Sequence, residues 1–278
     1  MIIDFHTHTF PDELAVKTIP YLEKMGGFIA RTNGTIKDLE SSMVKANIDL
    51  SILLPVVTNP KQTLKINNCA IENNKLDKFI SFGGMHPDFE LYEEELKRLK
   101  DNGIKGIKLH PDYQNTFFDD DKYAKIIDCA FSLGLIVVTH SGVDYGFTSE
   151  VKVTPFRIKN LLSKLKNKGI LVLAHMGYTY KWDMVIDELR GYDVYFDLAL
   201  SLGNLVRNGV TTPLMDENTL LKFIDTFGSE RILFATDSPW MDQKESVDVL
   251  NSYKKIKDAD RDNILYKNAL RLLDLKES

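Results

Sequence analysis

Residues 135–140 read LIVVTH, an apolar run that ends at a histidine. Residues 170–175 repeat this pattern as ILVLAH, and residues 52–57 read ILLPVV. Nearly continuous runs of valine, isoleucine and leucine are typical of strands buried on both faces of a parallel sheet. Working outward from these runs, we predict strands at residues 2–8, 50–57, 79–86, 106–110, 135–140, 170–175, 193–200 and 231–237.

The segments between the predicted strands have the periodicity and charge of helices. The clearest are residues 61–79, 88–103 and 118–134, and the last two end at glycine, as helices commonly do. Eight strands that alternate with helices predict an α/β fold, a (β/α)8 TIM barrel. A doubly wound open sheet is the alternative, but no glycine-rich phosphate loop follows the first strand.

The chain shows no linker rich in proline, glycine or serine, so we predict one barrel domain over residues 1–278. We predict long loops at residues 9–37 and 201–215, each following a strand. In a TIM barrel the loops after the strands form the catalytic face. Both loops are therefore candidate lids or walls of a substrate site.

The composition is ordinary for a globular protein, with 44% hydrophobic and 27% charged residues. The 35 basic and 40 acidic residues give a net charge of -5, which argues against nucleic acid as a partner. Apolar runs are far shorter than the roughly 18 residues that cross a bilayer, so we expect no membrane partner. The start MIIDFHTHTF lacks the features of a signal peptide, and Cys69 and Cys129 make no disulfide framework. We therefore expect a cytoplasmic protein.

Every histidine of the chain lies at or near the end of a predicted strand: His6, His8, His86, His110, His140 and His175. Asp237 ends the eighth strand. The carboxyl ends of barrel strands meet at one mouth, so these residues are expected to lie close together. His6 and His8 are two residues apart and share one face of a strand, and Asp237 lies on the neighbouring strand once the barrel closes. Histidine and aspartate ligands suit Zn²⁺, and also Mn²⁺, Fe²⁺ or Co²⁺.

Each of these residues also has a purely structural interpretation when it is taken alone. His86 and His110 precede prolines and can cap strands, His140 and His175 can be satisfied buried groups, and Asp237 can cap a helix. One metal site accounts for most of the positions jointly, so we favour metal binding.

The motifs IDFHTH, GIKLHP, VVTHSG, LAHMG and ATDSP follow one another along the chain. Together they resemble the amidohydrolase superfamily of metal-dependent TIM-barrel hydrolases. The likeness is greater to its amidohydrolase-related branch, which includes aminocarboxymuconate-semialdehyde-decarboxylase-like enzymes. The C-terminal segment NILYKNALRLL also looks like the closing helix of that branch.

The resemblance implies a role for each matching residue. His6, His8 and Asp237 would bind a first metal ion, and His140 would bind the same ion or bridge to a second. His175 would bind the second ion of a binuclear enzyme, or orient or protonate the substrate of a mononuclear one. The cofactor is thus one or two divalent ions, with zinc expected first and manganese, iron or cobalt as alternatives.

Lys108 and His110 share a face of the fourth strand. In some members of the superfamily a lysine of this strand is carboxylated and bridges two metal ions. Lys108 would then be that bridge, or an ammonium group that binds an anionic substrate, or a structural lysine. His110 is assigned to the same position, as a bridging or substrate-binding group.

The expected activity is hydrolysis of an amide, ester or lactone-like bond in a small molecule by metal-activated water. A bound metal lowers the pKa of water to about 7. Asp237 would take the proton of the water and return it to the leaving group, and His175 would stabilise the oxyanion. Two alternatives remain open: a metal-dependent non-oxidative decarboxylase of a small carboxylic acid, and a non-catalytic metal- or ligand-binding barrel.

The substrate-binding residues are harder to predict. Arg31 and Arg207 lie in the two long loops and can each pair with a carboxylate. Tyr113 follows His110, and Trp240 follows Asp237, so both can line the site, and His86 is a further candidate. For partners we expect a small-molecule substrate, and the resemblance makes a homodimer plausible.

Overall fold

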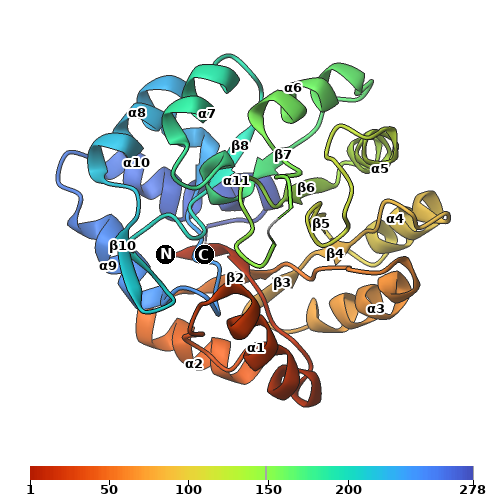
Figure 1. Cartoon of the computed structure of the whole chain (residues 1–278), viewed down its shortest axis with the longest axis horizontal. Coiled ribbons are helices and arrows are strands. Elements are labelled where there is room, and N and C mark those ends of the chain that lie inside the picture. The colour runs from red at the N-terminus through yellow and green to blue at the C-terminus, as the bar shows by residue number, and fades with distance from the viewer. Residues whose placement is uncertain (148, 278) are drawn as a thin grey trace.

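The computed structural model describes residues 1–147 and 149–277, and in this part of the chain eight parallel strand positions form a ring inside a layer of helices (Figure 1). One position is divided into two short strands, β3 and β4. The strands are β1 (Ile3–Thr7), β2 (Leu50–Leu53), β3 (Phe79–Ser81), β4 (Gly83–Gly84), β5 (Gly106–Leu109), β6 (Ile136–Thr139), β7 (Leu171–Leu173), β8 (Tyr195–Asp197) and β11 (Ile232–Leu233). All eight predicted strands are present, but each is shorter than predicted.

The strands form two hydrogen-bonded sheets, in the orders β1-β2-β3 and β11-β8-β7-β6-β5-β4. Only Phe82 separates β3 from β4. On the other side, the Phe5 amide donates to the Phe234 carbonyl, and the Asp237 amide donates to the His6 carbonyl, both at 2.9 Å. These bonds join the segment that follows β11 to β1. The fold is the predicted TIM barrel.

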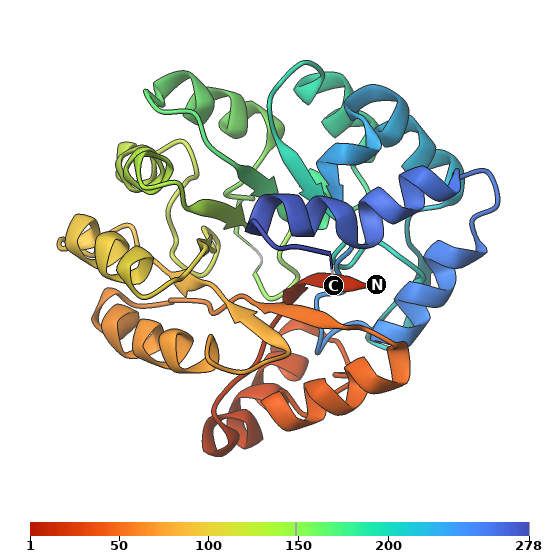
Figure 2. The ribbon, with the colours of Figure 1, turned by 180° about the vertical axis from the view of Figure 1, so that it is seen from behind.

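Helices α2 to α9 cover the outside of the ring, and α11 lies across its rear end (Figure 2). Their bounds are α2 (Ile36–Ala46), α3 (Thr63–Asn73), α4 (Tyr92–Asp101), α5 (Asp121–Ser132), α6 (Pro155–Lys164), α7 (Trp182–Leu189), α8 (Glu217–Phe227), α9 (Gln243–Ser252), α10 (Asp258–Asp262) and α11 (Asn268–Leu273). In the described part of the chain, none of the helices has the length and apolar character needed to span a membrane.

Successive side chains of each strand point to opposite faces, so the strands lie between two buried apolar clusters. In β6, Val137 packs with the cluster under the helices, and Val138 packs with the cluster inside the barrel. The inner cluster also holds Leu270 and Leu273 of α11, which close the rear end of the barrel. The same alternation turns Lys108 and His140 toward the mouth.

Phe82 is fully buried in the inner cluster, where its ring meets Phe5 edge-on at 5.9 Å. The Phe82→Ala variant is expected to lose about 3–5 kcal/mol of unfolding free energy, because little can refill the cavity. Urea denaturation measures this loss. Phe156→Ala, at a ring that is 63% exposed on α6, is the control and is expected to change stability little. Equal effects of the two variants would contradict the assignment of Phe82 to the core.

The prediction of a long loop at residues 9–37 was wrong, because α1 (Asp12–Gly26) lies inside it. The prolines and glycines of this segment, among them Pro11, Pro20, Gly26 and Gly27, had suggested a loop. Pro11 instead stands at the N-cap, and Gly27 ends the helix with a φ of 76° that glycine adopts freely. Pro20 lies within the helix. The residues that mark the start and the end of this helix were therefore wrongly interpreted as parts of a loop.

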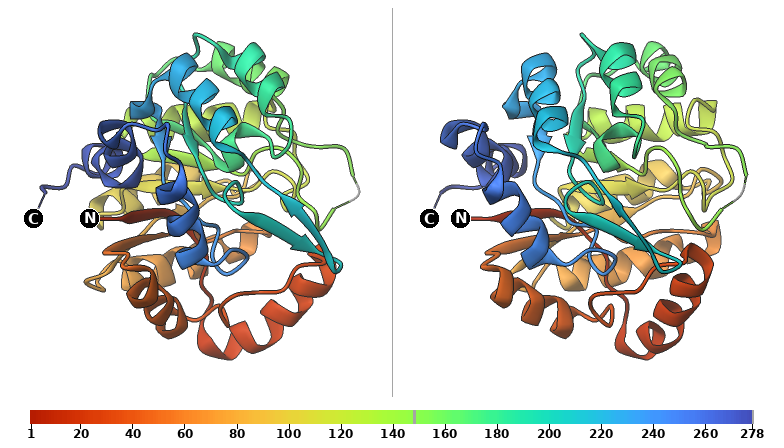
Figure 3. Two further views of the ribbon diagram at one scale, coloured as in Figure 1. Left: turned by 90° about the vertical axis from the view of Figure 1, so that its left-hand side faces the viewer. Right: turned by 60° about the vertical axis from the view of Figure 1, so that its left-hand side comes forward.

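The segment 201–215 was also predicted as a loop, but it contains an antiparallel hairpin of β9 (Asn204–Arg207) and β10 (Val210–Pro213). Its turn is Asn208–Gly209, a pair that strongly favours tight hairpins. The hairpin reaches α1 (Figure 3), where the Asn208 amide donates to the Gly27 carbonyl at 2.8 Å. Two segments far apart in sequence thus form one rim of the barrel mouth.

Candidate metal centre and active site

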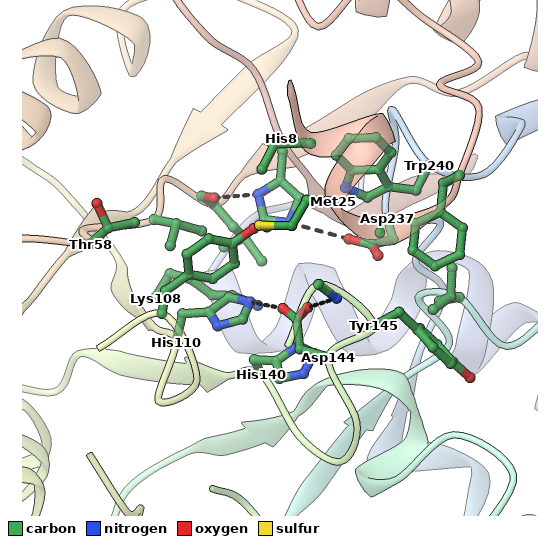
Figure 4. Close-up of a pocket in the computed structure, with 18 of the residues that line it drawn as sticks. His8, Met25, Thr58, Lys108, His110, His140, Asp144, Tyr145, Asp237 and Trp240 are labelled. Atoms are coloured by element: carbon green, nitrogen blue, oxygen red, sulfur yellow. Dashed lines mark hydrogen bonds and ion pairs between the residues drawn. The ribbon is translucent and has the colours of Figure 1, made fainter. Parts of the chain in front are cut away.

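The carboxyl ends of the strands surround a cavity of about 430 Å³ (Figure 4). Most of the residues predicted for the site line it: His6, His8, Lys108, His110, Tyr113, His140, His175, Asp237 and Trp240. The barrel therefore brings together side chains from strands across the whole chain.

An irregularity in β1 directs the first histidine into this cavity. Asp4 pairs with Ser51 and Thr7 with Leu53, so two residues of β1 oppose one residue of β2. Such a bulge changes the direction of the side chains that follow it. Phe5 consequently packs inside the barrel, while the next residue, His6, reaches across the mouth.

His6, His8 and Asp237 form a compact group in which one donor atom of each lies within 4.8 Å of the others. The Nε2 atoms of the two histidines are 3.1 Å apart. Asp237 Oδ1 lies 3.4 Å from His6 Nε2 and 3.2 Å from His8 Nε2. The dashed lines in Figure 4 show His8 between Asp237 and its backbone partner.

The hydrogen bonds of the two rings show that this group fits a metal ion. His6 Nδ1 contacts Asp197 Oδ2, and His8 Nδ1 contacts the Leu54 carbonyl, each at 2.7 Å. Both acceptors require the ring proton on Nδ1, so each neutral ring presents a lone pair at Nε2. Burial holds the pKa of His6 well below its usual value, which favours this neutral form. Two lone pairs and a carboxylate oxygen at these distances repel one another unless a cation lies between them.

Lys108 adjoins the same group. Its side chain is almost fully buried, and Nζ lies 3.1 Å from His6 Nε2. Burial lowers the pKa of Lys108 to about 8, although Asp197 and Asp237 oppose this effect. Lys108 therefore has a larger neutral fraction near neutral pH than an exposed lysine.

Asp237 is held as a carboxylate. Its burial alone would raise the pKa, but the adjacent His8 and His6 outweigh burial and bring the pKa below its usual value. An ionised carboxylate suits the binding of a cation better than the donation of a proton.

His175 and Asp237 both have left-handed backbone conformations, with φ of 58° and 70°. For residues other than glycine, such strain costs roughly 1–3 kcal/mol and is typical of functional sites. Hydrogen bonds fix His175, whose amide donates to Asp197 at 2.9 Å and whose Nδ1 contacts the Ala199 carbonyl at 3.1 Å. Its Nε2 lies 3.0 Å from His140 Nδ1. His140 thus approaches His175, and it lies outside the His6 group.

Three of the predicted substrate-binding residues do not line the cavity. Arg31 borders a separate surface pocket, and His86 Nδ1 accepts a bond from the Asp88 amide at 3.1 Å. Arg207 Nε donates to the Gly26 carbonyl at 2.8 Å, and its guanidinium lies 4.9 Å from the ring centre of Tyr145. Arg207 therefore links the hairpin to α1 and to the neighbouring loop. This contact could not be predicted, because it depends on a hairpin that was itself not predicted.

The sequence interpretation missed two buried carboxylates, Asp4 and Asp197, and one partly buried carboxylate, Asp144. Asp197 ends β8, and an aspartate at the end of a strand was an available signal. Asp144 lies in the loop after β6 and lines the cavity. Asp4 lies at the base of the site, where Oδ2 accepts bonds from the Thr236 hydroxyl at 2.6 Å and from Gln243 at 2.8 Å.

Asp4 predicts a dependence of stability on pH. Burial raises its pKa to about 6, although bonds from Gln243 and Thr236 oppose the shift. Because the folded pKa exceeds the unfolded value of 3.8, its contribution is full below about pH 4 and is lost as the pH rises through about 6. The loss is about 3 kcal/mol.

The Asp4→Asn variant is expected to lack this loss, because an amide does not ionise. Gln243 Oε1 has no hydrogen-bond partner in the described structure, so after its side-chain amide rotates by 180° it can accept a bond from the amide of the introduced asparagine. Urea denaturation of both proteins from pH 4 to pH 8 measures the difference. Curves that stay parallel would contradict the predicted ionisation of Asp4.

The barrel and its histidine–aspartate centre define a class of protein, the TIM-barrel enzymes of the amidohydrolase superfamily. The family model described as Amidohydrolase (Amidohydro_2) matches residues 3–275, and the chain belongs to this family. No curated protein matches the chain by sequence.

The solved structures of similar fold include proteins named as decarboxylases and a protein named as a hydrolase. The 2,6-dihydroxybenzoate decarboxylase from Rhizobium is 18% identical, with 98% of each chain covered and a TM-score of 0.71. A dihydroxybenzoic acid decarboxylase from Polaromonas sp. JS666, solved with bound manganese, is 17% identical, with 100% of this chain and 98% of that chain covered and a TM-score of 0.69. A probable 2-pyrone-4,6-dicarboxylic acid hydrolase from Acinetobacter baumannii is 17% identical, with 99% of each chain covered and a TM-score of 0.64.

Proposed function

We propose that this enzyme is a metal-dependent decarboxylase of a small aromatic carboxylic acid. The observation that carries the proposal is the position of the His6, His8 and Asp237 group in a cavity with largely aromatic and aliphatic walls. The decarboxylase names among the solved structures of similar fold support it.

The cavity walls suit an aromatic ring. Phe28 lies 5.5 Å from Tyr145 and 6.3 Å from Trp240 between ring centres, and these three residues form an aromatic rim. Among the described residues that line the cavity, Lys108 is the one lysine or arginine. A substrate anion is therefore best placed beside Lys108 and the metal centre, with its ring against the apolar walls.

His6, His8 and Asp237 would hold the metal, and their nitrogen and oxygen donors fit Zn²⁺, with Mn²⁺, Fe²⁺ and Co²⁺ as alternatives. When bound, a divalent ion supplies positive charge for the substrate carboxylate and a neighbouring oxygen. Asp237 stays ionised, so the proton for the substrate comes from His175. This proton moves to the ring carbon that bears the carboxylate. The bond to the carboxylate then breaks, CO₂ leaves, and the bonding electron pair returns to the ring.

Hydrolysis of an ester, amide or lactone is the second candidate. The ionised state of Asp237 favours it, because a carboxylate beside the metal centre can accept the proton of an attacking water and return it to the leaving group. His175 would then donate a hydrogen bond to the developing oxyanion.

The two reactions are separated by their products. The metal-loaded enzyme is incubated in deuterated water with ortho-hydroxybenzoic acids and, separately, with aryl esters and lactones of similar size. We expect CO₂ release and deuterium at the vacated ring carbon, both abolished in Asp237→Asn. Turnover of esters or lactones without CO₂ from any acid would overturn decarboxylation in favour of hydrolysis.

Lys108 has two proposed roles that differ in charge. As an ammonium group it would bind the substrate carboxylate, and as a carbamate it would contribute a further oxygen ligand. Carbon-13 NMR after incubation with labelled bicarbonate distinguishes them, because only the carbamate acquires the label. The label is expected to be absent from Lys108→Gln.

A further inference from the structure

Thr236 is buried beside Asp237, and the proposed reaction gives its side chain no role. Its hydroxyl donates to Asp4 Oδ2 at 2.6 Å and accepts from the Ser238 amide at 3.2 Å. Since the Ser238 amide supplies its own proton, the hydroxyl proton points to Asp4. The hydroxyl therefore links Asp4 to the residue that follows Asp237.

The backbone amides around Asp237 all have acceptors. The Thr236 amide donates to Asp4 Oδ1 at 3.0 Å. The next amide, that of Asp237, donates to the His6 carbonyl at 2.9 Å, and the Ser238 amide donates to the Thr236 hydroxyl. Because β11 ends before this segment begins, regular strand pairing does not extend through it. Two of these bonds instead depend on a side-chain acceptor, Asp4 or Thr236.

This segment carries a strained residue of the metal centre. Asp237 has a φ of 70°, and aspartate keeps such a left-handed conformation only where the surrounding structure fixes it. Its Oδ1 lies 3.4 Å from His6 Nε2 and 3.2 Å from His8 Nε2. Rotation of the backbone toward a relaxed conformation would move the carboxylate relative to both histidines. The spacing of the donor atoms therefore depends on what holds the backbone on each side of Asp237.

Asp4 connects this segment to the histidine half of the centre. It is fully buried, and its Oδ1 accepts from the His6 amide at 3.2 Å as well as from the Thr236 amide. Its Oδ2 accepts from Gln243 of α9 at 2.8 Å and from the Thr236 hydroxyl, so each oxygen has two donors. A carboxylate with this many donors is a fixed point between β1 and the segment that holds Asp237.

We infer that Thr236 is a positioning residue for the first site, the group formed by His6, His8 and Asp237. Its hydroxyl, anchored on Asp4, holds the backbone of Asp237 so that the carboxylate keeps its spacing from the two histidines. Thr236 acts through Asp237, because its own side chain does not line the cavity. The inference rests on the metal centre of the proposed function, but it is independent of which reaction the enzyme catalyses.

Metal affinity tests this role without an activity assay. The apoprotein is titrated with Co²⁺ in competition with a chelator, and the visible absorption of bound Co²⁺ reports the geometry of its ligands. Thr236→Val keeps the shape of the side chain but lacks the hydroxyl. It is expected to bind Co²⁺ roughly 10-fold more weakly than the wild type, with an altered spectrum. Thr236→Ser keeps the hydroxyl and is expected to restore both the affinity and the spectrum.

Thr63→Val is the matched control. Thr63 is also buried, and its hydroxyl donates to the Pro60 carbonyl at 2.9 Å at the start of α3, where it does not line the cavity. This variant is expected to lose stability to urea, as Thr236→Val does, but to keep the Co²⁺ affinity and spectrum of the wild type. The comparison separates positioning of the metal ligand from general destabilisation.

Circular dichroism identifies a variant that fails to fold, and Thr236→Ala then replaces Thr236→Val in the comparison. Wild-type affinity and spectrum in the folded variant without the hydroxyl, or a weakening that Thr236→Ser does not reverse, would overturn the inference. A wild type that binds no Co²⁺ would overturn the metal centre and this inference with it. The expected affinities without decarboxylation would contradict only the proposed reaction.

Discussion

Replacing both His6 and His8 with alanine is expected to remove the metal of the first site and to lower kcat/KM roughly 10³-fold or more. The loss follows from the several kilocalories per mole that a catalytic metal contributes to transition-state stabilisation. Only Asp237 of the group would remain, and one carboxylate does not hold a divalent ion in a defined position. Elemental mass spectrometry and steady-state kinetics on the folded variant measure both effects.

The barrel should survive this double substitution, because its inner apolar cluster lies below the site. Circular dichroism and the urea midpoint provide the control. Full retention of metal at the first site by the folded double variant would contradict the assignment of the centre to His6 and His8. Loss of metal with unchanged activity would show that the reaction does not use it.

Asp197→Asn is expected to weaken metal binding at the first site by roughly 10–100-fold. Asp197 is fully buried, and it contacts His6 Nδ1 through Oδ2 at 2.7 Å while Oδ1 accepts from the His175 amide at 2.9 Å. One carboxylate thereby fixes the orientation of a proposed ligand and of the proposed proton donor. The asparagine oxygen can replace one of these acceptors, but its amide group cannot accept at the other.

The measurement is a competition titration with a chelator, followed by kinetics at saturating metal. Excess metal should restore part of the activity of Asp197→Asn, because the ligands themselves remain. Asp193→Asn, at a carboxylate 72% exposed just before β8, is the control and should bind metal as the wild type does. An unchanged affinity in Asp197→Asn would show that His6 keeps its orientation without this contact.

The strands and the histidines at their ends could be predicted because both follow from local pattern. An apolar run such as LIVVTH is visible in the sequence, and the geometry of a closed barrel brings the carboxyl ends of such strands together. The bulge in β1 could not be predicted, since it depends on how β1 pairs with β2. The alternation of side chains alone would place Phe5 and His6 on opposite faces of the strand, whereas both lie inside the barrel.

The missed residues show where sequence patterns lose information. Asp144 comes four residues after His140 in an irregular loop, and no spacing rule places it beside His110. Arg207 was assigned to a substrate because its loop seemed open, but the folded hairpin uses it to hold α1. Contacts between segments about 180 residues apart depend on the tertiary fold, and a single sequence does not contain them in readable form.

The packing of α11 against the inner cluster has a consequence for how substrate enters the enzyme and how product leaves it. Ala269, Leu270 and Leu273 fill the rear of the barrel together with Ile3 and Leu233, which leaves the mouth as the route for small molecules. The substrate and the product of the proposed decarboxylation must then both pass the rings of Phe28 and Trp240. In the proposed reaction the product keeps the aromatic ring of the substrate, so it occupies the same part of the cavity until it dissociates. Inhibition by the product should accordingly be competitive with the substrate.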